Sequence, residues 1–142
     1  MLDIDETSLS NYQQLAATNF SGAAGALASA VFAASSPAIG PTLGLYQDAR
    51  GLQVSVFFIT GRPSAVSTFT ESNLNAAGYT DRAGIFFKPS SDAVIPFKSG
   101  ARAALEQQGY RIVANVGDQE SDLAGGHADR SFKLANPFYF IS

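Results

Sequence analysis

The apolar residues of this 142-residue chain fall into short runs separated by longer stretches with helical spacing. The run at 54–59 is almost continuously apolar, which is typical of a strand buried on both faces of a parallel sheet. Other apolar segments predict further strands at 1–7 (the tail of a strand entering an acidic loop), 84–87, 111–116, 131–134 and 138–141.

Helices are expected between these strands. The expected helical segments are 11–34 (broken near Ser21-Gly22), 42–50, 64–77 (ended by Gly78) and 97–108 (ended by Gly109). Strands that alternate with helices predict an α/β fold, here a three-layer Rossmann-like domain with a mostly parallel sheet. From the length we expect one domain, 1–142, with residues 11–50 as a small helical cover over one edge of the sheet. The carboxyl ends of parallel strands meet at one edge, so polar residues that follow strands are candidates for a ligand site.

Composition narrows the range of functions. The net charge is −3 and the nine Lys and Arg residues are scattered, so the basic patch of a nucleic-acid-binding protein is missing. The chain has no cysteine, which excludes disulfides, thiolate metal sites and cysteine nucleophiles. The richest small apolar run, 23–34, is shorter than the ~20 residues of a membrane-spanning helix. Compartment and oligomeric state stay open, and a homodimer is one option.

Two carboxylates stand two residues apart after the first expected strand. Residues i and i+2 of an extended segment share a face, so Asp3 and Asp5 can address one site. One carboxylate can serve as a covalent nucleophile toward phosphorus, and the other can donate a proton to the leaving oxygen. Taken alone, the segment is equally consistent with an acidic turn or a helix cap.

Groups that favour an anion follow downstream. Thr60 and Gly61 come directly after the apolar run and offer a hydroxyl and backbone N–H groups, which bind phosphate well at a helix start. Arg62 can bind phosphate through two N–H groups or form a salt bridge with a carboxylate. Lys98, at the expected start of the next helix, can supply a fixed positive charge.

Two more carboxylates, Asp118 and Asp122, follow the strand expected at 111–116. Magnesium prefers oxygen ligands and usually retains waters and substrate phosphate. Asp3 and Asp118 are therefore candidates to bind Mg²⁺, with Asp122 supporting them. Each of these polar groups is common in isolation. Their occurrence one after another at strand ends and helix starts is what indicates phosphoryl chemistry.

These residues lie in motifs that run in a fixed order along nearly the whole chain. The motifs are Leu2-Asp3-Ile4-Asp5-Glu6-Thr7, Phe58-Ile59-Thr60-Gly61-Arg62-Pro63, Phe97-Lys98-Ser99-Gly100-Ala101-Arg102, Asn115-Val116-Gly117-Asp118-Gln119 and Ser121-Asp122-Leu123. In this order they resemble the haloacid dehalogenase (HAD) superfamily. Within it they are most similar to the subfamily IIIB branch of plant acid phosphatases, vegetative storage proteins and bacterial acid phosphatases.

The resemblance implies roles for individual positions. It implies that Asp3 is the nucleophile and that Asp5 is the general acid–base. The implied phosphate-binding residues are Thr60, Gly61, Arg62 and Lys98. The implied magnesium site comprises Asp3, Asp5 (through its backbone carbonyl), Asp118 and Asp122. The implied activity is hydrolysis of small-molecule phosphate monoesters, with Mg²⁺ as cofactor and an aspartyl-phosphate intermediate.

Two departures from the family pattern bear on function. Only Met1 and Leu2 stand where the family has a full apolar strand before the first aspartate, so we expect a shortened central strand. Residues 12–51 are poor in the aromatic residues of this branch, so substrate preference does not carry over. The alternatives are a catalytically weak storage or binding homologue, a truncated inactive member of the fold, and phosphotransfer to another alcohol. Retention of both Asp3 and Asp5 favours an enzyme.

Overall fold

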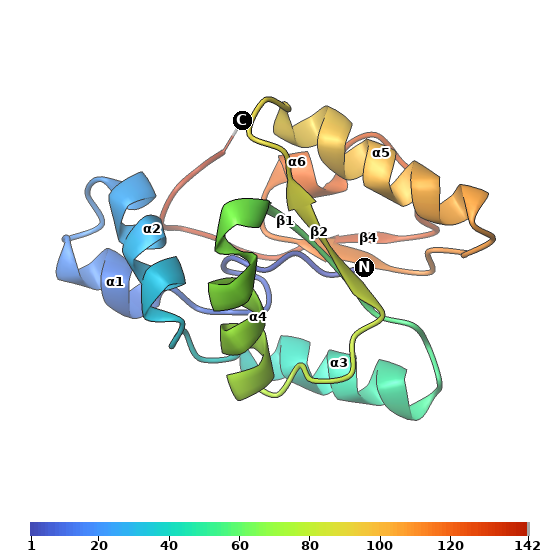
Figure 1. Cartoon of the computed structure of the whole chain (residues 1–142), viewed down its shortest axis with the longest axis horizontal. Coiled ribbons are helices and arrows are strands. Elements are labelled where there is room, and N and C mark those ends of the chain that lie inside the picture. The colour runs from blue at the N-terminus through green and yellow to red at the C-terminus, as the bar shows by residue number, and fades with distance from the viewer. Residues whose placement is uncertain (142) are drawn as a thin grey trace.

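The computed structural model describes residues 1–141, in which short strands are flanked by helices (Figure 1). The elements in chain order are α1 (Tyr12–Ala17), α2 (Ala23–Ala33), α3 (Gly40–Gly51), β1 (Phe57–Pro63), a 3-10 turn η1 (Ser64–Val66), α4 (Ser67–Ala76), β2 (Gly84–Lys88), α5 (Val94–Gln107), β3 (Asn115–Gly117), α6 (Glu120–Leu123) and β4 (Ser131–Lys133). Within this described part, no helix is both long and apolar enough to cross a membrane.

The strands pair in parallel, and one residue near the N-terminus joins them into a continuous surface. β1 pairs with β2, and β3 pairs with β4. Leu2 forms parallel bridges to both Phe58 and Val116, and its N–H donates to the Phe57 carbonyl at 2.9 Å. The resulting order is β2, β1, Leu2, β3, β4. The predicted parallel α/β architecture is confirmed, and the predicted short central strand is reduced to a single bridge on each side.

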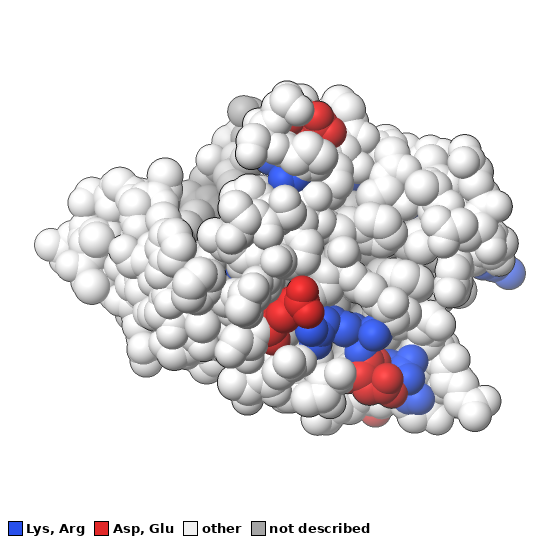
Figure 2. All heavy atoms as spheres, viewed as in Figure 1, with Lys and Arg blue, Asp and Glu red and all other residues white. Residues whose placement is uncertain are grey.

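Helices cover both faces of these strands. Figure 1 shows α5 and α6 on one side and α3 and α4 on the other, with α1 and α2 set apart as a small lobe. Helix α2 contacts α4, and α5 contacts both β1 and β2. Figure 2 shows a face with few charged side chains, where acidic and basic groups are mixed rather than separated into patches.

An aromatic and aliphatic core anchors the strands below the site. Tyr46, Phe58 and Tyr79 form a cluster with ring centroids 5.1–6.3 Å apart. All three are nearly fully buried, and burial of each such side chain contributes about 1.5–3 kcal/mol. The Tyr79 hydroxyl also donates to the Ser8 carbonyl at 2.9 Å. The core therefore fixes the loop that carries Asp3 and Asp5. The buried core comprises Leu2, Ile4, Leu9, Tyr46, Val56, Phe58, Leu74, Tyr79 and Val116.

Two strands begin later than the apolar runs predict. β1 covers Phe57–Pro63 rather than 54–59, and β3 covers Asn115–Gly117 rather than 111–116. The physical reason is the short central strand, because Leu2 bridges Phe58 and Val116, and beyond these bridges a space separates residues 54–56 from residues 111–114.

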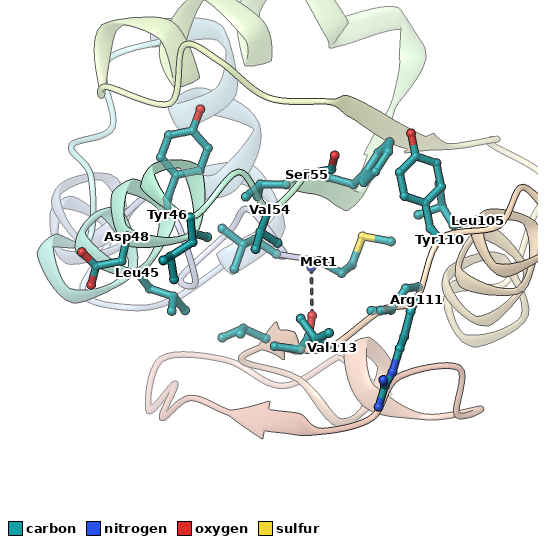
Figure 3. A pocket seen from close by; sticks show the side chains of 18 residues that line it. Met1, Leu45, Tyr46, Asp48, Val54, Ser55, Leu105, Tyr110, Arg111 and Val113 are labelled. Carbon is teal, nitrogen blue, oxygen red and sulfur yellow. Dashed lines mark hydrogen bonds between the residues drawn. The ribbon is translucent and has the colours of Figure 1, made fainter.

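That space is an apolar groove of about 260 Å³, seen from close by in Figure 3. Val54, Tyr110 and Val113 are among its lining residues, and the Met1 ammonium lies within it. The ammonium donates to the Ala114 carbonyl at 2.9 Å. Burial, with a smaller contribution from a nearby arginine, lowers the pKa of the Met1 amino group to about 6. The groove therefore holds an amine with a lowered pKa among mostly apolar side chains.

The expected strand at 138–141 is wrong, because no strand forms there. The Phe138 ring stacks on Phe20, with centroids 5.4 Å apart, and the Ile141 N–H donates to the Gln119 side chain at 2.9 Å. Because of these contacts, residues 138–141 cross the molecule and do not pair along a sheet edge. The strand expected at 131–134 is confirmed as β4.

Helix positions are largely as expected, with one consequence for the site. The break between α1 and α2 falls at 18–22, as predicted, and the helix expected at 64–77 appears as η1 followed by α4. Helix α5 begins at Val94, four residues before Lys98, so Lys98 lies in its second turn and not at its start.

Candidate active site

Asp3, Lys98 and Asp122 form a buried cluster at the carboxyl ends of the strands. The Lys98 Nζ donates to Asp3 Oδ1 at 2.6 Å and to Asp122 Oδ1 at 2.5 Å. The other carboxylate oxygen of Asp122 accepts the Gln119 N–H at 2.8 Å. All three residues are at most 5% exposed, so their charges interact in a largely water-free environment. Three segments far apart in sequence are thereby held at one point.

The charges in this cluster perturb one another. Burial raises the pKa of Asp3 well above its usual value, the carboxylates of Asp122 and Asp118 raise it further, and the Lys98 ammonium opposes the rise. Burial alone would lower the pKa of Lys98, but Asp3 and Asp122 raise it. The lysine therefore stays charged, and the carboxylates around it carry an excess of negative charge.

Asp118 completes the acidic group from the end of β3. Its Oδ1 accepts the Thr7 hydroxyl at 3.2 Å, and its Oδ2 accepts the Asn136 Nδ2 at 2.7 Å and the Gln119 side-chain amide. Burial raises the pKa of Asp118, Asp122 adds to the rise, and these hydrogen bonds oppose it. Asp118 lacks a direct salt bridge within residues 1–141, so its charge depends on hydrogen bonds for stabilisation.

The oxygen donors suit a hard divalent cation. One carboxylate oxygen from each of Asp3, Asp118 and Asp122 lies within 4.8 Å of the others. Both oxygens of Asp122 are already engaged, by Lys98 and by the Gln119 N–H, so Asp122 supports the group rather than facing outward. Within residues 1–141, Asp3 Oδ2 and the Asp5 backbone carbonyl accept no hydrogen bond, so both oxygens are open to a ligand. Magnesium takes such oxygen ligands, and the donor set therefore fits it.

Asp5 is held in a two-point ion pair. Arg62 donates to its two carboxylate oxygens at 2.7 Å and 3.1 Å, and a third guanidinium nitrogen donates to the Thr70 hydroxyl at 3.1 Å. Burial would raise the pKa of Asp5, but the Arg62 charge and the hydrogen bonds from Arg62 and Asn11 lower it below its usual value. Of the two roles that the sequence allowed for Arg62, the structure contains the salt bridge.

Thr60 and Gly61 lie inside β1, which continues past the strand end expected at Ile59, and the helical segment expected at 64–77 begins directly after it with η1. The strand continues through a bulge to Pro63, because β2 still pairs with it there. The Thr60 hydroxyl accepts the Arg62 N–H at 3.1 Å, which turns the chain locally. Gly61 and Arg62 line the same cavity as Asp3 and Lys98, whereas Thr60 is fully buried beside it.

Glu6 and Asn11 form a supporting network that the sequence did not reveal. Glu6 adopts a left-handed conformation (φ 52°) and its carboxylate accepts the Asn11 N–H at 2.7 Å. The Asn11 side-chain amide donates to Asp5 at 2.8 Å and accepts the Ser36 hydroxyl at 2.8 Å. The Tyr139 hydroxyl donates to Glu6 at 2.6 Å. The only signal in the sequence was the acidic run itself, since Ser36 and Tyr139 come from two distant segments.

Backbone geometry near Asp122 depends on Gly117 and Arg102. A Cβ atom at Gly117 would overlap the Asp122 side chain, so glycine allows that carboxylate to fold back toward Lys98. The fully buried Arg102 donates to the backbone carbonyls of Asp122, at 2.8 Å, and of Gly126, at 2.8 Å. Arg102 thus holds the turn that follows α6, another role not evident from the sequence.

These groups surround one cavity of about 280 Å³. Of the predicted site residues, Asp3, Asp5, Gly61, Arg62, Lys98, Asp118 and Asp122 all line it. The other walls come from α2, from Val94 and from the C-terminal residues Tyr139 and Ile141. The arrangement offers a buried carboxylate beside an ammonium, a second carboxylate within reach, and space for a small ligand.

Comparison with known proteins places the chain in a family. The family model described as HAD superfamily, subfamily IIIB (Acid phosphatase), matches residues 1–142. Acid phosphatase 1 of Solanum lycopersicum is 42% identical over 109 residues, which cover 74% of this chain and 43% of that protein. Vegetative storage protein 1 of Arabidopsis thaliana is 36% identical over 109 residues, covering 75% of this chain and 40% of that protein. The chain therefore spans less than half the length of these curated relatives.

A solved structure supports the fold. The class C acid phosphatase from Bacillus anthracis superposes with a TM-score of 0.77 at 21% identity, over 98% of this chain and 66% of that one. At this identity the likeness concerns the fold. It agrees with the parallel α/β arrangement described above.

Proposed function

The chain belongs to the HAD superfamily, subfamily IIIB (acid phosphatase), and on that premise we propose that it hydrolyses small-molecule phosphate monoesters through Asp3. The observation that carries this proposal is the 2.6 Å contact between Lys98 and Asp3, buried at the carboxyl ends of parallel strands beside two further carboxylates. Phosphoryl transfer depends mainly on positioning and charge neutralisation, and this contact supports both.

In the first step, Asp3 Oδ2 attacks phosphorus. A bond forms between that oxygen and phosphorus as the ester P–O bond breaks, and Asp5 gives its proton to the departing alkoxide. Lys98 holds Asp3 Oδ1, so the other oxygen is directed to the substrate. The Gly61 N–H and Lys98 bind the phosphoryl oxygens. Thr60 either binds the group directly or keeps the Arg62 turn in place.

In the second step, Asp5 accepts a proton from water. The resulting hydroxide attacks phosphorus, the bond to Asp3 Oδ2 breaks, and inorganic phosphate leaves with Asp3 restored as a carboxylate. A Mg²⁺ ion held by Asp118, the Asp5 carbonyl and Asp3 Oδ1, the oxygen that does not attack phosphorus, would supply positive charge that offsets the charge of the phosphoryl group. Asp122 would keep the position of Lys98 and is not required as a direct ligand.

The Asp5–Arg62 pair links this mechanism to pH. Arg62 lowers the pKa of Asp5 and favours its carboxylate form, whereas the first step needs the protonated form. Turnover of esters with poor leaving groups should therefore rise as the pH falls below neutral.

A storage or binding protein on the same scaffold is the second candidate, because relatives of this chain include vegetative storage proteins. Such a role would not require both Asp3 and Asp5 to remain carboxylates or Lys98 to be paired with Asp3. The geometry therefore favours the enzyme.

Hydrolysis of p-nitrophenyl phosphate separates the two candidates. We expect turnover that needs MgCl₂, is lost in EDTA, and is lost in Asp3→Asn. The exposed Asp48→Asn on α3 serves as a matched control and should retain full activity. A folded wild-type protein without turnover in MgCl₂ between pH 4.5 and 8 would contradict the proposal and favour a storage or binding protein.

A further inference from the structure

We propose that the cavity selects phosphate monoesters of compact, uncharged, apolar alcohols, and that α2 contacts the alcohol part of the substrate. This inference rests on the proposed function. The same cavity that contains Asp3 and Lys98 is also lined by Leu27, Ala28 and Val31, which project from one side of α2. A phosphate bound at Asp3 therefore places its ester group against this helix or close to it.

Among residues 1–141, the cavity lining offers no free cation for a second anionic group. Of the described residues that line it, Arg62 and Lys98 are the cations. Arg62 donates to Asp5 and Thr70, and Lys98 donates to Asp3 and a second aspartate. A carboxylate or second phosphate on the alcohol would thus be desolvated without a partner, which is costly.

Two of the uncharged polar side chains that line the cavity, Tyr139 and Gln119, are also engaged. The Tyr139 hydroxyl donates to Glu6 at 2.6 Å. The Gln119 side chain donates to Asp118 and accepts the Ile141 N–H. A hydroxyl-rich alcohol would find few of the hydrogen bonds that it loses on leaving water, and unsatisfied groups reduce affinity.

The remaining surface is aliphatic and small. Val94 of α5 and Ile141 add to the wall formed by α2, whose sequence AAGALASAVFA carries no charged residue. The volume of about 280 Å³ is at the low end for small-molecule sites, so a compact alcohol such as a phenol fits better than a large one. Burial of its ring would gain roughly 25 cal/mol per Å² of apolar surface.

The first test compares matched aryl esters. We expect kcat/KM for phenyl phosphate to exceed that for 4-carboxyphenyl phosphate and that for glycerol 2-phosphate by roughly tenfold or more. Calorimetric binding of phenylphosphonate and of 2-hydroxyethylphosphonate, in MgCl₂, gives a readout that needs no turnover, and phenylphosphonate should bind tighter by a similar factor. Tighter binding of phenylphosphonate without hydrolysis of any ester would contradict the proposed function but not this inference. Equal affinities, or no binding at all, would overturn this inference.

Substitutions on α2 locate the contact. Ala28→Lys introduces a cation at an exposed position of the cavity wall and should shift the kcat/KM ratio of the carboxylated to the plain aryl ester upward by roughly fivefold. The matched control is Ser29→Lys, on the same helix at an exposed position outside the cavity lining, which should leave the ratio unchanged. A shift of the same size in both variants, or in neither, would contradict contact between α2 and the alcohol.

Discussion

Asp118 should have two opposing effects on stability: its charge repels the neighbouring carboxylates when no cation is bound, and it helps to bind Mg²⁺. The substitution Asp118→Asn should separate these two effects. The substitution removes a charge but keeps the shape, and its hydrogen bonds can be retained. The amide oxygen can accept from Gln119 and Asn136, and the amide nitrogen can donate to the Thr7 hydroxyl. No buried group is left without a partner, so the change tests charge rather than packing.

The size of the expected change in stability follows from the distances between the carboxylates. With oxygens within 4.8 Å and an effective dielectric constant near 20, each carboxylate pair repels by about 3 kcal/mol. Asp118 repels both Asp3 and Asp122, while Lys98 offsets part of that repulsion. We therefore expect the variant to be more stable than the wild type in EDTA at neutral pH, by about 1–3 kcal/mol, or roughly 2–10 °C in Tm.

Magnesium should reverse this order. A ligand at 100 times its Kd stabilises the native state by about 2.7 kcal/mol, so MgCl₂ should raise the Tm of the wild type and leave that of Asp118→Asn nearly unchanged. The pH dependence has a definite sign. Because the fold raises the pKa of Asp118, the gain in the variant is present at neutral pH and disappears as the pH falls through the carboxylate range.

Thermal melts of both proteins, with MgCl₂ or EDTA at pH 4 and 7, test this reasoning. Asp48→Asn is the control, since that exposed side chain should change stability by less than about 0.5 kcal/mol in every condition. A variant that is less stable than the wild type in EDTA, or that keeps the full magnesium shift, would refute it.

Two further predictions concern the surrounding structure. Gly117→Ala should displace the Asp122 side chain, and we expect lower Tm and at least a hundredfold loss of kcat, to be measured by melting and turnover; full activity would contradict the overlap. Lys98→Met leaves buried carboxylates without their cation, so unfolding in urea should show a loss of about 3–5 kcal/mol, and a loss below about 1 kcal/mol would contradict the burial of that charge.

The sequence predicted the parts of the fold that follow from local patterns. The apolar runs indicated parallel strands, and polar residues after them pointed to the edge where Asp3, Lys98 and Asp118 meet. Strand ends were less well predicted, because the limits of β1 and β3 depend on where Leu2 stops pairing. Apolar character alone does not reveal whether a neighbouring strand is present.

Long-range hydrogen bonds account for most of what the sequence did not predict. Tyr139 reaches Glu6 across 133 positions, and Asn136 reaches Asp118 only because the C-terminal segment crosses the site. That segment is apolar enough to suggest a strand, yet packing of Phe138 on Phe20 determines its course. Arg62 shows the same limit, since its two possible partners were chemically equivalent and only the spatial position of Asp5 decides between them.

The central claim is that Asp3 accepts the phosphoryl group, and acid-quench trapping tests it most directly. The protein would be mixed with p-nitrophenyl phosphate and MgCl₂, quenched in acid within one turnover, digested and analysed by mass spectrometry. We expect one phosphoryl group on the N-terminal peptide at Asp3, absent in Asp3→Asn and absent when EDTA replaces MgCl₂. Turnover of the ester with no phosphoryl group on that peptide, or with the group on another residue, would contradict it.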